Sequence, residues 1–326
     1  MTNLPEMGGP SIRPKALSMT DSLSRYHTPV REHPHVLGTP GLVVTTTGSS
    51  GYGSQRRKPD AAAPPAMLSL MQALPSFQLT GQIALVTGAA RGLGRAISLA
   101  LAEAGADVAI GLRDIHADSG LAKEIAARGR RVLPLQMEMT SLKQITDGIE
   151  ETVRHFGRLD ILVNNAGVAP TNLAENVVEK DFDYTLAVNL KGTFFASQAA
   201  GRVMIQQKYG RIINMGSQAG FAALPTESVY CMTKAGIAHL TKCLAVEWGK
   251  YNINVNAVAP TFIRTDGTQP VLSDPEFYAD TVERIAALHR IGEPIEVAGA
   301  VVFLASPAAS LITGHTLLID GGWTAR

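Results

Sequence analysis

Short β-branched runs alternate with helical patterns from Leu79 to the C-terminus, and this alternation constrains the fold more than any other feature. Each run contains adjacent apolar residues, which point to opposite faces of a strand, and amphipathic segments such as 94–104 and 141–156 lie between runs. Strands that are apolar on both faces and separated by helices indicate a parallel sheet covered on two sides. We therefore expect an α/β fold with a doubly wound parallel sheet, whose ligands bind beyond the carboxyl ends of the strands. The expected strands are 83–87, 107–112, 131–136, 160–164, 211–216, 253–259 and 315–319.

The N-terminal segment has a different composition from the rest of the chain. Residues 1–66 are rich in Pro, Gly, Ser and Thr and lack a sustained helical or strand period. Such a stretch cannot bury enough apolar surface to offset its ordering entropy. We expect a disordered extension over 1–78, followed by one domain over 79–326. The extension is interpreted as a dispensable tail, with Met67 as an alternative start, or as a targeting segment. An acid-poor transit peptide does not fit the acidic residues Glu6, Asp21, Glu32 and Asp60.

Charge, apolar runs and cysteines exclude several functional classes. The net charge of +1 gives no footprint for nucleic acid or an anionic membrane. No apolar run reaches the roughly 18 residues of a membrane span, and the apolar segment 297–305 suits a buried helix. On one helix, Cys231 and Cys243 would lie about 18 Å apart, too far for a disulfide. We therefore expect a reduced, cytoplasmic protein. No His or Cys pattern indicates a metal site.

A glycine-rich turn follows the first expected strand. The sequence TGAARGLG occupies 87–94 and leads into a helix. Glycines let the backbone approach a pyrophosphate, while the helix N-terminus supplies amide donors and positive potential. Such a turn alone is weak evidence, but its position in a βαβ unit predicts a nucleotide site. The candidate binding residues are Gly88, Arg91, Gly92, Leu93 and Gly94.

The end of the second expected strand bears on the choice of cofactor. NAD enzymes usually place an acidic residue there to hold the ribose hydroxyls, but this position is Leu112. Arg113 follows, and Arg91 lies in the glycine turn; two guanidinium groups would suit a 2′-phosphate. We therefore predict NADP(H). NAD(H) stays open as the alternative if Asp114 binds the ribose.

A serine, a tyrosine and a lysine form the candidate catalytic centre. Ser217 closes an expected strand, and Tyr230 and Lys234 stand four apart on an expected helix, where they share one face. A free phenol, with a pKa of about 10, is a poor base at pH 7. A nearby cation stabilises phenolate, and lowering the pKa by three units requires about 4 kcal/mol. A tyrosine and lysine at this spacing are common on helix surfaces. Together with Ser217 and the upstream nucleotide turn, they predict a proton-transfer site.

From about Leu79 to Arg326 the sequence resembles the short-chain dehydrogenase/reductase family. The resemblance rests on seven ordered motifs, which are TGAARGLG (87–94), NNAG (164–167), Asn189, Ser217, YCMTK (230–234), PTFIRT (260–265) and DGG (320–322). It implies a Rossmann-type fold and hydride transfer between a nicotinamide and a carbonyl or secondary alcohol. It also implies a homotetramer built through the helices containing Asn189 and Tyr230 and through the C-terminal strand.

The resemblance assigns roles to individual residues. Tyr230 would be the acid/base, and Ser217 would hydrogen-bond the substrate carbonyl. Lys234 would hold the nicotinamide ribose and lower the pKa of Tyr230, and Asn189 would support a water molecule in a proton relay. Further cofactor contacts are implied for Glu138, Asn164, Ala166, Gly167, Pro260, Ile263 and Thr265. Two positions depart from the family pattern: Thr261 replaces a glycine, and Glu138 replaces an aspartate.

The substrate and its alternatives depend on the segment after the sixth expected strand. Its polar residues favour a small polar substrate such as a sugar acid or polyol, as in gluconate and sugar-alcohol dehydrogenases; they are Thr268, Gln269, Asp274, Glu276, His289 and Arg290. Alternatively, these residues simply face water. A 3-oxoacyl-(acyl-carrier-protein) reductase is the rival enzyme; Lys208 could dock an acidic carrier, but Tyr251 occupies the second expected basic position. A non-catalytic nucleotide sensor would typically lack the serine, tyrosine or lysine, and all three are present.

Overall fold

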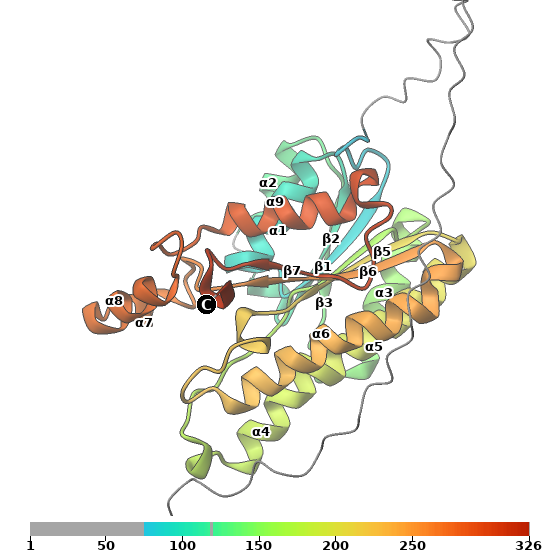
Figure 1. Cartoon of the computed structure of the whole chain (residues 1–326). Helices are drawn as coiled ribbons and strands as arrows, with labels where there is room; N and C mark the ends of the chain where they lie inside the picture. Colours follow the sequence, from blue (N-terminus) through green and yellow to red (C-terminus); the bar gives the residue numbers. More distant parts are fainter. Residues whose placement is uncertain (1–74, 118–119, 326) are drawn as a thin grey trace, which may run out of the picture. The chain divides into compact units, whose positions relative to one another are not determined.

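The computed structural model describes residues 75–117 and 120–325. The expected extension therefore lies almost entirely outside the described residues. Within them, seven strands pair in parallel into one sheet in the order β3-β2-β1-β4-β5-β6-β7 (Figure 1). The strands are β1 (Ile83–Thr87), β2 (Asp107–Leu112), β3 (Val132–Gln136), β4 (Ile161–Asn164), β5 (Gly210–Met215), β6 (Ile253–Pro260) and β7 (Thr316–Ile319). Each predicted strand is confirmed to within one residue at either end.

Helices cover both faces of the sheet, as the alternating pattern predicts. One face packs against α1, α2 and α9, and the other packs against α3, α5 and α6 (Figure 1). The bounds are α1 (Gly92–Glu103), α2 (Leu121–Ala127), α3 (Leu142–Phe156), α4 (Glu179–Leu186), α5 (Thr193–Gln207), α6 (Ser228–Trp248), α7 (Gln269–Leu272), α8 (Pro275–Arg284) and α9 (Pro294–Ala305). The doubly wound α/β architecture is thus confirmed.

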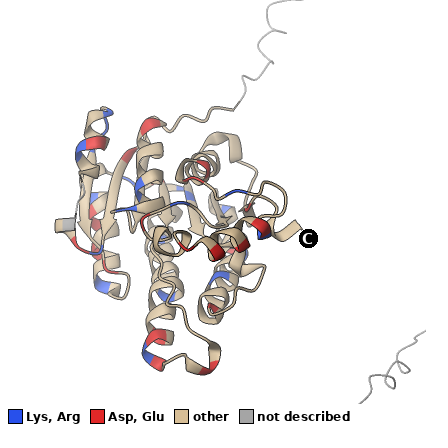
Figure 2. Cartoon of the chain, turned by 90° about the vertical axis from the view of Figure 1, so that its left-hand side faces the viewer, with Lys and Arg blue, Asp and Glu red and all other residues tan. Residues whose placement is uncertain are grey.

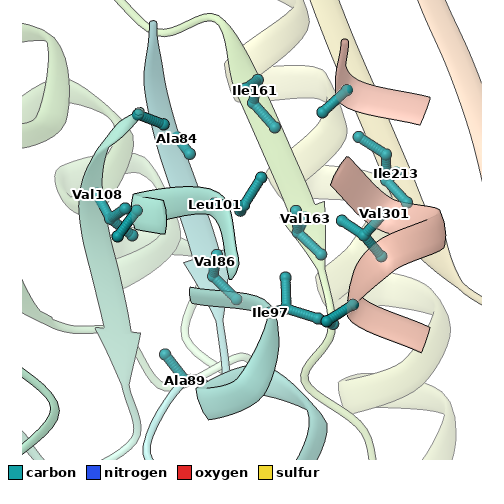
Figure 3. Close-up of a cluster of buried hydrophobic side chains, with 14 of the residues drawn as sticks. Ala84, Val86, Ala89, Ile97, Leu101, Val108, Ile161, Val163, Ile213 and Val301 are labelled. Atoms are coloured by element: carbon teal, nitrogen blue, oxygen red, sulfur yellow. The ribbon is translucent and has the colours of Figure 1, made fainter. Parts of the chain in front are cut away.

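The two core layers follow from the two-residue period of the strands. In β1, Ala84 and Val86 point into the layer formed with α1 and α9 (Figure 3), whereas Leu85 points into the opposite layer. In β4, Ile161 and Val163 face the first layer and Leu162 the second. All six side chains are fully buried. Complete burial of a Val, Leu or Ile side chain contributes about 1.5–3 kcal/mol, which explains why these strands are apolar up to their last residue.

The order of the strands creates a crevice beside β1. The chain runs from β1 outward to β2 and β3, then returns to place β4 on the other side of β1. Connections therefore diverge at the carboxyl ends of β1 and β4, where ligands bind in open α/β sheets.

The surface carries both signs of charge. Figure 2 shows Lys and Arg interspersed with Asp and Glu along the helices and loops. Over residues 75–117 and 120–325, no helix combines the length and apolar character needed to cross a bilayer. The apolar segment in α9 supplies Val297, Val301 and Leu304 to the core, as predicted for a buried helix.

Candidate active site

A cleft of about 800 Å³ opens at the carboxyl edge of the sheet. Its volume falls in the range of small-molecule and cofactor sites, roughly 300–1,000 Å³. The cleft brings together fourteen predicted residues, namely Gly88, Arg91, Gly92, Leu93, Gly94, Arg113, Glu138, Ala166, Gly167, Ser217, Tyr230, Pro260, Ile263 and Thr265. Three others, Asn164, Asn189 and Lys234, are buried and do not line it.

The glycine turn has the geometry needed to receive a phosphate group. Gly88 has a φ of +64°, a conformation that side chains disfavour. A Cβ on Gly94 would lie 2.3 Å from the carbonyl oxygen of Gly88, so only glycine lets α1 begin against this turn. Arg91 precedes α1 without a side-chain capping bond, and the first helical turn holds no acidic residue. The amides at this helix start therefore offer donors and positive potential for an anion.

The NNAG segment is fixed to the glycine turn. The backbone amides of Asn165 and Ala166 both donate to Oγ1 of Thr87 at 3.0 Å. Nδ2 of Asn165 also donates to the carbonyl oxygens of Thr87 and Gly88, at 3.0 and 3.1 Å. Asn165 was not among the predicted residues, although it lies in the same motif. In contrast, Asn164 turns inward and donates to Ser197 Oγ and Asn214 Oδ1.

The loop after β2 presents both cofactor alternatives. Arg113 and Asp114 both line the cleft and are exposed, as is Arg91 across from them in the glycine turn. Among the described residues, neither guanidinium group has a hydrogen-bond or ion-pair partner. Asp114 accepts a hydrogen bond from the backbone amide of His116 at 2.9 Å. Two uncommitted guanidinium groups fit a phosphate, while Asp114 keeps the ribose alternative open.

The catalytic candidates converge from β5 and α6. Ser217 follows β5; its hydroxyl donates to Gln218 Oε1 at 2.8 Å and accepts from the amide of Ala219 at 3.1 Å. Tyr230 and Lys234 stand one turn apart on α6, with Lys234 Nζ 5.4 Å from the centroid of the Tyr230 ring. Lys234 is 5% exposed and donates to the carbonyl oxygen of Met215 at 2.7 Å. The predicted serine and tyrosine thus meet at one end of the cleft, with the predicted lysine buried behind the tyrosine.

Burial dominates the electrostatics of this pair. It raises the pKa of Tyr230 to about 12, and the nearby Glu227 raises it further, while a hydrogen bond with Ser217 acts in the opposite direction. Burial lowers the pKa of Lys234 to about 8. The expected lowering of the tyrosine pKa is therefore not produced by these residues alone. The reason is that the buried ammonium is itself destabilised and is directed to the carbonyl oxygen of Met215.

Asn189 lies directly behind this pair. It belongs to a π-helical turn, Ala187–Gly192, which joins α4 to α5. Its Nδ2 donates to the Val168 carbonyl oxygen at 2.9 Å and to Thr233 Oγ1 at 3.1 Å, and its Oδ1 accepts from the Val168 amide at 2.9 Å. A Cβ on Gly167 would lie 3.5 Å from Asn189 Oδ1 and 3.7 Å from Lys234 Nζ, so the two groups are close neighbours. A relay water held by Asn189 stays a prediction.

Known proteins resemble this chain over most of its length. The family model described as enoyl-(acyl carrier protein) reductase matches residues 88–324. The chain belongs to the short-chain dehydrogenase/reductase family. The 2-dehydro-3-deoxy-D-gluconate 5-dehydrogenase of Escherichia coli (strain K12) is 39% identical over 254 residues, which cover 78% of this chain and 99% of that protein. The NAD-dependent glycerol dehydrogenase of Listeria innocua is 41% identical over 252 residues, covering 77% and 96%. A 3-oxoacyl-(acyl-carrier-protein) reductase of Synechocystis is 39% identical over 246 residues, covering 75% and 97%.

A solved structure of the family shows the same fold. The gluconate 5-dehydrogenase of Burkholderia cenocepacia, in complex with NADP and tartrate, superimposes with a TM-score of 0.74 at 34% identity. The match covers 78% of this chain and 99% of that one.

The two departures from the family pattern both line the cleft. Thr261, where the family has a glycine, has a buried hydroxyl oxygen with no hydrogen-bond partner among the described residues. Glu138 follows β3, five strand positions away from β6, and accepts a hydrogen bond from the amide of Thr140 at 3.2 Å. Among the described residues, no group of three or more His, Cys, Asp or Glu could hold a metal ion.

The polar residues after β6 do not support the prediction, made from composition, that this segment contacts a small polar substrate. Of the six polar residues named above, only Thr268 lines the cleft. Asp274 caps α8 by accepting from the amides of Glu276 and Phe277, and Arg290 forms an ion pair with Glu296. These side chains serve local structure or face water, which is the alternative interpretation of the segment.

The residues used to weigh carrier docking lie away from the cleft. Lys208 ends α5 and Tyr251 follows α6, and the next residues begin β5 and β6. Both therefore lie at the amino edge of the sheet, opposite the cleft. The residue types at these two positions therefore neither favour nor disfavour docking of an acyl carrier protein at the active site.

Proposed function

We propose that this chain is an NAD(P)-dependent oxidoreductase that interconverts a secondary alcohol and a carbonyl in a small polar substrate. One observation carries the proposal: Ser217 and Tyr230, with Lys234 buried behind them, share a single cleft with an open glycine turn at a helix start. Relatives named for gluconate, glycerol and related polyol oxidation support the substrate class.

The chemistry divides between cofactor and protein. An oxidised nicotinamide, when bound, would supply the hydride acceptor, which takes up the carbinol hydrogen with both electrons of its C–H bond. The hydroxyl proton of the substrate passes to the phenolate oxygen of Tyr230, so that alcohol becomes ketone and one proton is gained by the protein. The Ser217 hydroxyl donates to the oxygen that becomes the carbonyl, and Gln218 Oε1 holds this hydroxyl in place beforehand. In the reverse direction Tyr230 returns the proton to the forming alkoxide.

We propose NADP(H) as the preferred cofactor. Arg91 and Arg113 would hold its 2′-phosphate, and the amides at the start of α1 would face its pyrophosphate. NADP in the Burkholderia structure supports this choice, and the NAD-dependent Listeria relative supports NAD(H) as the alternative.

We also propose a cytoplasmic homotetramer. Large apolar side chains exposed on α5, α6 and the edge strand β7 support an assembly through these elements; they are Phe194, Met232 and Leu318. Cys231 and Cys243 are free thiols on one helix, which suits a reducing compartment. Light scattering coupled to size exclusion should give four times the chain mass, and a monomer would contradict the assembly.

Two alternative functions, an acyl reductase and a non-catalytic sensor, can be tested together with the proposed one. The Synechocystis relative favours a 3-oxoacyl-(acyl-carrier-protein) reductase as the second candidate. A spectrophotometric screen of sugar acids, polyols and 3-oxoacyl thioesters with both cofactors separates these enzymes. A non-catalytic sensor would bind the cofactor and turn over none of them.

The decisive variant is Tyr230→Phe, which removes only the phenolic oxygen. General acid–base catalysis contributes about 10²–10⁴-fold, and we expect kcat to fall by that factor while the Kd for NADPH stays unchanged. Tyr251→Phe, at the far edge of the sheet, is the matched control and should retain full turnover. Unchanged turnover in Tyr230→Phe would refute the mechanism.

A further inference from the structure

A single carboxylate faces the catalytic end of the cleft without a partner. Glu227 immediately precedes α6, lines the cleft and is half-buried. Its backbone is fixed at both ends, because its amide donates to Leu224 and its carbonyl accepts from Cys231. Among the described residues, none donates a hydrogen bond to its carboxylate or forms an ion pair with it. The sequence-based prediction missed Glu227, because it matches no motif.

The charged residues that line the cleft differ between its two ends. Arg91, Arg113, Asp114 and Glu138 follow the strands β1 to β3, and Glu227 alone follows β5. The ends of β2 and β5 are three strand positions apart, roughly 14 Å at the usual spacing. The arginines therefore belong to the adenosine side. On the β5 side no Lys, Arg or His among the described residues lines the cleft.

The nearest ammonium does not compensate this charge. Lys234 lies behind Tyr230, is 5% exposed and donates to the carbonyl oxygen of Met215. It is also absent from the residues that line the cleft. The substrate end is thus negative, and it has no lining cation to pair with an anionic substrate.

We propose that Glu227 determines substrate specificity by selecting neutral polyhydroxy substrates, polyols and the corresponding hydroxyketones, over sugar acids. The inference rests on the proposed alcohol oxidation at Tyr230 and narrows its substrate class. An ionised carboxylate accepts hydrogen bonds from hydroxyl groups, and such charge-assisted bonds are strong. Placed against a substrate carboxylate it is repulsive, and no cation offsets that repulsion. Burial already raises the pKa of Glu227, as expected for a carboxyl group without donors.

The test compares matched substrates that differ in one terminal group. Glycerol, threitol, xylitol and glucitol are compared with glycerate, threonate, xylonate and gluconate, under saturating NADP⁺. In the wild type we expect kcat/KM for the best polyol to exceed that of its acid by at least about tenfold, which corresponds to 1.4 kcal/mol. Glu227→Gln keeps the size and removes the charge. It should reduce this ratio by about tenfold or more, mainly through KM.

Two further variants separate charge from structure. Glu227→Asp keeps the charge and should keep the polyol preference. Asp114→Asn removes another cleft carboxylate, on the adenosine side, and should leave the polyol-to-acid ratio unchanged. Because the charge of Glu227 raises the pKa of Tyr230, Glu227→Gln should also move the rise of kcat/KM with pH to lower pH for both substrates. A purely structural defect would not produce this shift.

The outcomes distinguish this inference from the proposed function. A wild type that prefers the acids, or a ratio that Glu227→Gln leaves unchanged, would overturn the role of Glu227 while leaving alcohol oxidation intact. If Glu227→Gln does not fold, the polyol-to-acid ratio of kcat/KM in the wild type and in Glu227→Asp still tests the role of Glu227. Turnover of 3-oxoacyl thioesters alone would overturn the proposed substrate class, and this inference with it.

Discussion

Lys234→Met should change stability in a way that depends on pH. Lys234 is 5% exposed, and burial lowers the pKa of its ammonium from 10.5 to about 8. This lowering means that folding carries a cost of about 3 kcal/mol when the group is charged. Methionine is similar in length and uncharged, so it removes this cost. It also removes the donor to the carbonyl oxygen of Met215, which costs about 1–3 kcal/mol.

The sign of the effect follows from proton linkage. Below pH 8 the folded and unfolded chains both hold the Lys234 proton, and the wild type carries the full cost. Between pH 8 and 10.5 the unfolded chain holds a proton that the folded chain has released, so wild-type stability rises with pH. We expect Lys234→Met to be more stable than the wild type by up to about 2 kcal/mol at pH 7. At pH 10.5 it should be less stable by about 1–3 kcal/mol.

Urea unfolding of the cofactor-free proteins at several pH values between 7 and 10.5 measures this difference. Other titrating groups are common to both proteins and cancel in the comparison. Lys242→Met, at an exposed position on the same helix, is the matched control and should show no crossover. A difference in unfolding free energy that stays constant from pH 7 to 10.5 would refute the reasoning. The gain in stability should accompany a loss of turnover, because Lys234 is placed to serve catalysis.

Two further variants test the cofactor end. Arg113→Ala should weaken NADPH binding at least about tenfold more than NADH binding, since it removes one guanidinium from a 2′-phosphate; equal losses in fluorescence titrations would contradict this assignment. Gly94→Ala places a Cβ 2.3 Å from the carbonyl oxygen of Gly88, so we expect cofactor binding to be lost and the free energy of unfolding to fall by about 1–3 kcal/mol. Gly249→Ala meets no atom within 4 Å and should leave both quantities intact.

The fold could be predicted from sequence because its five central strands are buried on both faces. An apolar run such as 161–164 has few alternative environments, and its length and flanking helices fix its place in a parallel sheet. Irregular helical geometry could not be predicted. The π-helical turn Ala187–Gly192 mixes good and poor helix formers, and its extra residue per turn carries no periodic signal. Similarly, α1 begins at Gly92, two residues before the expected helix, because glycine is a poor indicator of helix.

The candidate site was predictable where chemistry and spacing coincide. Tyr230 and Lys234 follow from helical spacing, and Ser217 from its place after a strand. The roles of Asn165 and Gln218 depend on hydrogen bonds between separate loops, which local patterns do not encode. The substrate contacts predicted for the polar segment after β6 were wrong for the same reason. Asp274, for example, caps α8, and composition does not reveal such a cap.

The electrostatics of Tyr230 imply that its proton is coupled to the oxidation state of the cofactor. With a pKa of about 12, only about one molecule in 10⁵ holds phenolate at pH 7, too few for an efficient base. Additional positive charge must therefore favour phenolate, and an oxidised nicotinamide carries such a charge while the reduced form does not. By reciprocity, NADP⁺ affinity should rise with pH, approaching tenfold per unit, once the pH exceeds the pKa of Tyr230 in the complex. The nicotinamide charge also disfavours the ammonium of Lys234, so Tyr230→Phe is needed to identify the contribution of the tyrosine. This variant should reduce the difference between the NADP⁺ and NADPH profiles, and parallel profiles in the wild type would show that the cofactor charge does not activate the base.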